Sequence, residues 1–282
     1  MTGAPDARDT RDGLHHQGTG GVILYPKEAG VTSHDVVARV RRTMPMGIKV
    51  GHAGTLDPFA TGLLLVLVGR ATRAQRYLLG LPKAYRVIAR LGWISDTGDR
   101  DGELTDTGRV PADPRIPVGD QMQRPPAYSA VKVRGKRLYE LARAGQAQEG
   151  EPRPVTVHEA RRIEHDQQRA TFDVRCSSGT YVRQLVADLG DAYCEALERT
   201  SIGHFRLEDA DPGRVVPVGE ALSFMPGLEL DDADAERVAH GIRLALPDGM
   251  REPVLRLTCG GRLVAIAEPR DRQLQPVVVF AA

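Results

Sequence analysis

The chain of 282 residues lacks the features that define several large classes of protein. Its three cysteines lie far apart and are never spaced as C-x-x-C, which argues against a disulfide scaffold and a cysteine-based zinc site. Its longest apolar run, at 63–68, has six residues, whereas a membrane span needs roughly eighteen. Residues 1–18 contain no apolar stretch of the kind that a secretory signal requires. We therefore expect a disordered leader there and a cytoplasmic protein.

A marked excess of charge of either sign is also absent. The chain has 38 Lys and Arg against 37 Asp and Glu, a net charge of +1, and 41% of its residues are hydrophobic. A chain of this composition forms a packed core. At roughly 150 residues per domain, its length indicates about two domains.

The charges are nevertheless distributed unevenly along the chain. Residues 39–90 contain ten Lys or Arg and a single acid, Asp57, and a second basic cluster lies within 132–137. The compensating acids gather at 96–106 and 229–236. Arg70, Arg73 and Arg76 recur at helical spacing around a short helix expected at 71–79, which aligns them in one stripe. This pattern indicates a surface that binds phosphate, although each basic stretch alone is also compatible with a solvated face.

The local patterns predict a mixture of strands and helices. Thr32 opens a capping-box-like motif for a helix that runs to about Arg42, and alternating apolar residues at 84–91 predict a strand. Residues 95–126 are rich in Asp, Gly and Pro and are expected to form surface loops. The remaining patterns predict strands at 22–25, 128–133, 155–163 and 170–176, and helices at 137–144 and 180–189.

The order of these elements indicates the fold class and the domains. Because strands and helices do not alternate regularly, we expect an α+β fold with a mixed, mainly antiparallel sheet and flanking helices. A Met-Pro-Gly turn at 225–227 marks a boundary, so we assign 19–226 to a first domain and 227–282 to a small β domain. The strands of the second domain are expected at 254–258, 263–267 and 276–280.

Four residues have a local setting that suggests chemistry. Asp57 precedes a proline in a glycine-rich loop, which disfavours helix and projects a carboxylate that can serve as nucleophile or base. Arg183 falls in the first turn of a predicted helix, where a cation opposes the helix dipole, so we expect it to pair with a carboxylate or a phosphate. Asp57 can also simply form an Asp-Pro turn, and Arg183 can be an ordinary surface arginine. The other two residues are Tyr85 and His52, for which the ordinary alternatives are a core aromatic and a loop histidine.

Three segments, taken together, resemble a known family. The strings GHAGTLDPFATGLLLVLVGRATR, KAYRVIARLG and CSSGTYVRQLVADLG, in this order, resemble the catalytic segment and two further motifs of the TruB family of bacterial tRNA pseudouridine synthases. The resemblance extends from about Gly20 to Phe205. The tail resembles a shortened PUA-type RNA-binding domain. The resemblance implies that 19–226 is a catalytic domain and 227–282 an RNA-binding domain.

The resemblance implies roles for the residues singled out above. Asp57 is expected to be the catalytic aspartate, Arg183 its salt-bridge partner and Tyr85 the aromatic ring that stacks on the target uracil. His52 is expected to fill the space that the extruded base leaves, and Tyr181 to line the pocket.

Three basic residues are assigned to substrate binding. Lys27 matches the lysine of the family's DKPxGxTS motif, although Pro and Glu replace the Asp and Pro that flank it there. Arg73 and Arg76, from the basic stripe, are expected to contact RNA phosphates.

The implied reaction is the isomerisation of uridine 55 in the T-loop of tRNA. The bond from ring nitrogen 1 to the ribose breaks and the same uracil is rejoined through carbon 5, so we expect neither cofactor nor metal. The target base is expected to be flipped out of the folded RNA. We also expect the protein to act as a monomer. Whether Asp57 attacks the sugar, attacks the base or removes the 2′ proton stays open. Two other functions are considered: an RNA N-glycosidase, which would release uracil, and a tRNA-folding chaperone, which would not need Asp57.

Overall fold

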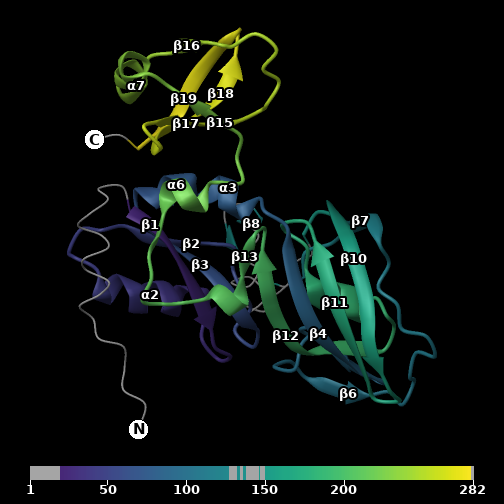
Figure 1. The fold of residues 1–282 in the computed structure, drawn as a ribbon. Helices are drawn as coiled ribbons and strands as arrows, with labels where there is room; N and C mark the ends of the chain where they lie inside the picture. Colours follow the sequence, from purple (N-terminus) through teal and green to yellow (C-terminus); the bar gives the residue numbers. More distant parts are fainter. Residues whose placement is uncertain (1–19, 127–131, 134–135, 138–145, 147–149, 281–282) are drawn as a thin grey trace.

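The structure is a computed structural model that describes residues 20–126, 132–133, 136–137, 146 and 150–280 (Figure 1). The predicted leader at 1–18, most of the strand predicted at 128–133 and nearly all of the helix predicted at 137–144 lie outside the described residues. Two short strands in this stretch, β8 (Lys132–Val133) and β9 (Lys136–Arg137), pair with each other. A strand residue therefore stands where that helix was expected to begin.

One large sheet forms the first part of the molecule. Neighbouring strands in it pair antiparallel, except that β12 and β3 run parallel where Arg199 lies beside Gly62. Within the described residues the sheet is therefore mixed and mainly antiparallel, which confirms the expected α+β fold. The path runs β14 (Val216–Pro217), β1 (Gly20–Lys27), β3 (Thr61–Gly69), β12 (Ala192–Ile202), β4 (Lys83–Leu91), β11 (Arg169–Cys176), β10 (Arg153–His165), β7 (Gly119–Gln123), with β2 (Val50–Ala53) on β3 and β13 (Phe205–Arg206) on β12.

Strand β3 is buried on both faces because other elements cover each side. Its side chains at 64, 66 and 68 pack against helix α2 (Ser33–Thr43), and those at 63, 65 and 67 pack with η1 (Arg70–Ala74), α3 (Gln75–Leu79) and α6 (Val218–Ala221). The capping box predicted for α2 is present: Thr32 N–H donates to Asp35 Oδ2 at 2.8 Å, and Asp35 N–H donates to Thr32 Oγ1 at 3.1 Å. The loop between β2 and β3, which carries Asp57, thus joins two well-anchored strands.

The other half of the sheet packs on helix α5 (Val182–Ala187), which is shorter than the helix predicted at 180–189. Strand β4 alternates as predicted, with Tyr85, Val87 and Ala89 buried on one face. The apolar side chains of α5 and those of β4, β11 and β12 form one core cluster, to which Leu56 of the Asp57 loop also belongs. This shared core brings the Asp57 loop and α5 together.

Two regions differ from the sequence-based expectation. Strand β12 lies at the centre of the sheet but was not predicted, because register irregularities after Cys194 and Arg199 break the alternation that marks a strand. Residues 95–126 were expected to form surface loops, which is wrong in part. They include β6 (Leu104–Asp106) and β7, and follow directly on β5 (Trp93–Ser95). Gln123, at the end of β7, is buried.

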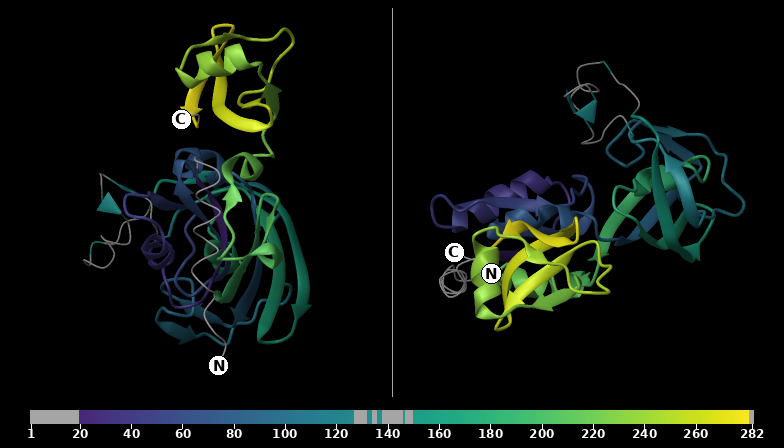
Figure 2. Two further views of the ribbon diagram at one scale, coloured as in Figure 1. Left: turned by 60° about the vertical axis from the view of Figure 1, so that its left-hand side comes forward. Right: turned by 90° about the horizontal axis from the view of Figure 1, so that it is seen from above.

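A second sheet follows the predicted boundary (Figure 2). Its order is β15-β17-β18-β19-β16, and the three strands predicted from the sequence are its centre: β17 (Leu255–Cys259), β18 (Arg262–Arg270) and β19 (Gln273–Val279). The sequence did not reveal its short edge strands β15 (Gly227–Glu229) and β16 (Leu244–Ala245) or its helix α7 (Asp232–Ala239). The short helix η2 (Leu207–Asp209) precedes β14.

The basic stripe lies where the two sheets meet. Arg70 and Arg73 donate to the carbonyl oxygens of Phe280 and Val279, at the end of β19, and Arg76 forms an ion pair with Glu268. Phe280 is fully buried in the core cluster that also contains the odd-numbered leucines of β3. The C-terminal sheet is therefore docked on η1 and α3 by both apolar and polar contacts.

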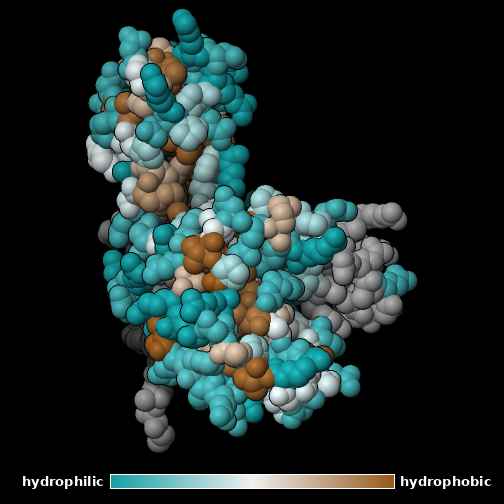
Figure 3. All heavy atoms as spheres, turned by 90° about the vertical axis from the view of Figure 1, so that its right-hand side faces the viewer, coloured by the Kyte–Doolittle hydropathy of each residue, from teal (hydrophilic) through white to brown (hydrophobic). Residues whose placement is uncertain are grey.

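The face that includes β7 and β10 is largely hydrophilic, with separate small apolar patches, and the C-terminal sheet rises from it as a distinct lobe (Figure 3). Exposed apolar residues scattered in this way are ordinary for a protein surface. Among the helices of the described residues, none is both long enough and apolar enough to cross a membrane.

Candidate active site

The loop that carries Asp57 is held from several sides. The buried hydroxyl of Ser33, at the start of α2, accepts from Leu56 N–H at 2.9 Å. The carbonyl of Pro58 accepts from Gly30 N–H at 2.9 Å and from Lys27 Nζ at 3.2 Å. The Asp57 side chain itself stays 31% exposed. The backbone on both sides of the carboxylate is therefore fixed, while the carboxylate faces an accessible space.

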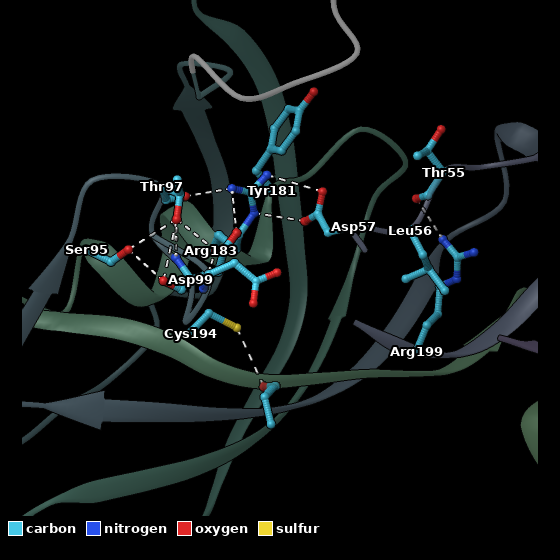
Figure 4. A network of polar contacts seen from close by, with 12 residues as sticks. Thr55, Leu56, Asp57, Ser95, Thr97, Asp99, Tyr181, Arg183, Cys194 and Arg199 are labelled. Atoms are coloured by element: carbon cyan, nitrogen blue, oxygen red, sulfur yellow. Dashed lines mark hydrogen bonds and ion pairs between the residues drawn. The ribbon is translucent and has the colours of Figure 1, made fainter. Parts of the chain in front are cut away.

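Arg183 forms a bidentate ion pair with Asp57 through two nitrogens of its guanidinium. Its Nε lies 2.8 Å from Asp57 Oδ2 and its Nη2 lies 3.2 Å from Asp57 Oδ1, although the two residues are 126 positions apart (Figure 4). The Arg183 side chain is only 4% exposed. A bidentate pair of arginine and carboxylate fixes the orientation of the carboxylate as well as its position. The structure thus brings together the two residues that the sequence analysis paired.

A second carboxylate, Asp99, completes this group and was not identified from the sequence. Arg183 Nη1 lies 3.1 Å from Asp99 Oδ2 and 2.6 Å from the carbonyl of Thr97. Asp99 Oδ1 accepts from Thr97 Oγ1 at 2.7 Å and from Asp101 N–H at 3.1 Å. The sequence signal was present only as an acidic, glycine-containing stretch at 96–102. Arg183 is therefore held between two carboxylates, so its position does not depend on Asp57 alone.

Tyr85 lies in β4, close to Asp57. It is 9% exposed and packs in the same core cluster as Leu56 and the buried side of α5. Burial raises the pKa of its hydroxyl, and the charges of Arg199 and Asp57 are near enough to affect it. The ring is thus held in the core that also anchors the Asp57 loop.

Tyr181 and Gln123 interact at the start of α5. The Gln123 side-chain amide donates to the Tyr181 carbonyl at 2.9 Å, and its oxygen accepts from Tyr181 N–H at 2.7 Å. The Tyr181 ring points away from the ion pairs of Arg183 (Figure 4). Gln123, which no sequence pattern singled out, therefore fixes the backbone two residues before Arg183.

Lys27 is buried beneath the Asp57 loop. Its Nζ donates to the carbonyls of Glu28 and Val31, both at 2.8 Å, in addition to that of Pro58. Burial lowers its pKa to about 8. Because these three carbonyls accept from its ammonium group, Lys27 holds the loop in place. The contact with substrate that was expected for Lys27 stays a prediction.

His52 has a buried ring nitrogen without a partner. Its Nδ1 makes no hydrogen bond to the described residues, while its ring lies 5.5 Å from that of His34 in an edge-to-face arrangement. Burial, more than the neighbouring His34 and Arg199, lowers its pKa to about 4. His52 is therefore neutral at pH 7 and has an unused polar atom beside the Asp57 loop.

The low pKa of His52 predicts a loss of stability in mild acid. The unfolded chain binds the proton with a pKa near 6.5, so the unfolded state gains protons first as the pH falls through 6.5 towards 4. We expect the free energy of unfolding to decrease by about 1 to 2 kcal/mol more between pH 7 and pH 5 in the parent than in His52→Gln. Urea titrations at both pH values measure this difference, and equal losses in the two proteins would contradict the assignment.

Two family models match the chain. Residues 41–182 match the family model of the TruB family pseudouridylate synthase N-terminal domain, and 225–281 match that of the tRNA pseudouridine synthase II C-terminal domain. The chain is 44% identical to tRNA pseudouridine synthase B of Thermobifida fusca, covering 93% of this chain and 98% of that protein. It is 38% identical to the enzyme of the same name from Corynebacterium aurimucosum, covering 92% and 95%.

The fold is also found among solved structures. A chain of a Cbf5-Nop10-Gar1 complex superposes with a TM-score of 0.71 at 24% identity, covering 95% of this chain and 87% of that chain. At this identity the likeness establishes the fold alone. The family matches span both sheets and include the loop of Asp57. The chain therefore belongs to the TruB family of pseudouridylate synthases, and it is an isomerase that converts uridine to pseudouridine.

Proposed function

We propose that this enzyme isomerises uridine 55 in the T-loop of tRNA and that Asp57 is its catalytic residue. The observation that carries the proposal is the bidentate contact of the buried Arg183 with the partly exposed carboxylate of Asp57. Tyr85 lies in the core cluster that also contains Leu56 of the same loop. Curated relatives, one of them 44% identical, are named tRNA pseudouridine synthase B. The resemblance of 51–73 to the family's catalytic segment supports the choice of target and residue.

The reaction needs a carboxylate in an enclosed site. The bond between ring nitrogen 1 and ribose carbon 1′ breaks, the uracil turns, and carbon 5 bonds to the same ribose carbon. The proton lost from carbon 5 is balanced by the one gained at nitrogen 1. Because the target lies in a folded loop, the base must first be extruded at a cost of a few kcal/mol. Asp57 assists cleavage, Arg183 holds its carboxylate in place, and Tyr85 offers an aromatic face to the base.

His52 and Tyr181 are proposed to contact the RNA beside the target base. His52 lies in β2, a few residues before Asp57, and its ring is only partly buried, so its exposed part can pack against the nucleic acid. Tyr181 directs its ring away from the ion-pair network, so it can line the entrance of the pocket. We further propose that the enzyme acts as a monomer in the cytoplasm, where tRNA is found.

A cationic surface at the end of α2 supports binding of a polyanion. Arg39, Arg41, Arg42 and Lys49 make no ion pair with any of the described residues. By contrast, Arg76 and Arg183 are paired with acids. The segment 44–51 and Arg41 border a hollow of about 670 Å³. Unpaired cations next to the β2 strand that leads to His52 suit the phosphates that flank the target nucleotide.

The proposed RNA contact of Arg76 can be separated from its contact with the C-terminal sheet. Arg76→Gln is expected to weaken tRNA binding and to reduce the salt dependence of the association constant by about one unit, since each phosphate contact contributes roughly that much. Glu268→Gln removes the same ion pair but keeps the cation, so it is the matched control. Binding isotherms at four salt concentrations measure both slopes.

The same measurement on Arg73→Gln extends the test along the stripe. Arg73 uses one guanidinium nitrogen on the Val279 carbonyl. A slope that stays at the parent value in Arg73→Gln and Arg76→Gln would contradict their role in RNA binding. A slope that falls equally in Glu268→Gln would assign the effect to docking of the second sheet.

Chromatography of the reaction products tests the proposed function against its alternatives. A tRNA transcript with radiolabelled uracil rings is incubated with the enzyme and then digested to nucleosides. We expect label in pseudouridine and none in free uracil. Free uracil would indicate an N-glycosidase, and unchanged uridine with improved tRNA folding would indicate a chaperone.

A further inference from the structure

Arg199 is a buried cation that neither the sequence patterns nor the reaction described above accounts for. It lies in β12 and is 1% exposed. Its guanidinium donates to three backbone carbonyls: Nε to Leu63 at 2.7 Å, Nη2 to Gly54 at 3.0 Å and Nη1 to Thr55 at 3.3 Å. Among the described residues, no carboxylate forms a salt bridge with it. Burying a cation without a directly bound anion is costly, so the surrounding structure must gain something specific from it.

The three carbonyls bracket the catalytic carboxylate. Gly54 and Thr55 open the loop that carries Asp57, and Leu63 lies just after that loop, in β3. One guanidinium therefore ties both ends of the loop to the central strand. In Figure 4, Arg183 and Arg199 lie on opposite sides of Asp57. Arg183 holds the carboxylate itself, whereas Arg199 holds the backbone that presents it.

Arg199 also reaches the predicted stacking residue. It is directly opposite Tyr85 in the pairing of β12 with β4, and its charge is near enough to affect the pKa of the Tyr85 hydroxyl. Burial lowers the pKa of Arg199, while the Tyr85 hydroxyl and the charge of Asp57 act in the other direction. On its other side, β12 runs so close to β3 that a Cβ at Gly62 would lie 2.4 Å from the Arg199 carbonyl oxygen. Strand β12 is thus in close contact with β4, which carries Tyr85, and with β3, which follows the Asp57 loop.

From this geometry we propose that Arg199 is a positioning residue for the isomerisation. Its planar fork holds the Gly54, Thr55 and Leu63 carbonyls in one arrangement, and its strand pairs with β4 at Tyr85, so the Asp57 carboxylate and the Tyr85 ring keep a fixed separation across the base. Lysine cannot replace it fully, because an ammonium group lacks the fork that reaches these acceptors together. The proposal rests on the catalytic role assigned to Asp57.

The test compares Arg199→Lys and Arg199→Met with Lys83→Met in the full-length enzyme. Lys83 is a suitable control because it is also buried, at 4% exposure, and its Nζ donates to two carbonyls, those of Leu79 and Leu81, outside the Asp57 loop. The single-turnover rate at saturating tRNA transcript, the dissociation constant for that tRNA and the thermal midpoint are measured for each protein. A purely structural role would change the midpoint alone.

We expect the rate at saturation to fall about 100-fold in Arg199→Met and about 10-fold in Arg199→Lys, since a shift of about 1 Å in a reacting group has effects of this size. The dissociation constant is expected to stay within about threefold of the parent value in both. Lys83→Met is expected to lose stability but to keep its rate within about threefold. If Arg199→Met does not fold, Arg199→Lys decides.

Two results would overturn the proposal. One is an Arg199→Lys rate within threefold of the parent, and the other is a rate loss in Lys83→Met equal to that in Arg199→Met. Asp57→Asn, measured in parallel, separates this proposal from the proposed function. An active Asp57→Asn would refute the function itself, whereas an inactive Asp57→Asn beside an unimpaired Arg199→Lys would refute only the role of Arg199.

Discussion

Asp57→Asn is expected to lower the rate of pseudouridine formation at saturating tRNA by at least about 10³-fold while changing tRNA affinity only a few fold. Asparagine keeps the size of the side chain and can still accept from Arg183, but it is neutral and is a poor base and nucleophile. Arg183 keeps its second partner, Asp99, so the site should remain folded. Single-turnover kinetics and binding isotherms with the same transcript separate the two effects.

Asp101→Asn provides the matched control for the loss of one negative charge. Asp101 lies near the site, and its side chain is 59% exposed and does not contact Arg183 through any hydrogen bond in the described residues. Its replacement is expected to leave the rate within about twofold, as exposed charges contribute little. Near-parent turnover by Asp57→Asn would remove Asp57 from the chemistry.

The second large effect is expected on stability. Arg183→Met removes the cation between two carboxylates, of which Asp99 is nearly buried and Asp57 partly so. Breaking a buried ion pair from one side usually costs about 3 to 5 kcal/mol, because a charge stays buried without its partner. We therefore expect the midpoint of urea unfolding to fall sharply and turnover to be lost as well.

A double substitution shows whether the uncompensated charge is the cause. Asp99→Asn in the Arg183→Met background removes the buried negative charge and is expected to restore a part of the lost stability but none of the turnover. Asp99→Asn alone leaves Arg183 with Asp57 and is expected to cost less than Arg183→Met. A double variant less stable than Arg183→Met would show that the two residues do not interact in this way.

Local patterns predicted the elements that carry their own signals. The capping box at Thr32 and the alternation around Tyr85 depend on residues a few positions apart, and the structure contains both. Strand β12 carries no such signal because its bulges interrupt the alternation, yet it is the strand that joins the two halves of the large sheet. The α+β class followed from the order of elements, whereas the path of the sheet did not.

The site residues also divide into those with a local sequence signal and those without one. Asp57 was singled out because a proline follows it, and Arg183 because it lies in the first turn of a predicted helix. Their pairing across 126 residues was suggested only by the resemblance to the TruB family. Gln123 and Arg199 were missed because their partners are backbone groups that only the folded chain brings near. Neither composition nor residue spacing predicts contacts of this kind. The basic stripe was recognised, but its contacts with the C-terminal sheet required the tertiary structure.

The most direct test of the account maps pseudouridine on a tRNA transcript after incubation with the parent enzyme and with Asp57→Asn. Carbodiimide modification followed by primer extension marks each pseudouridine as a stop. We predict one stop at uridine 55 with the parent enzyme, none with Asp57→Asn, and none on a transcript with cytidine at that position. A stop at another uridine, or an equal stop with Asp57→Asn, would contradict the central claim.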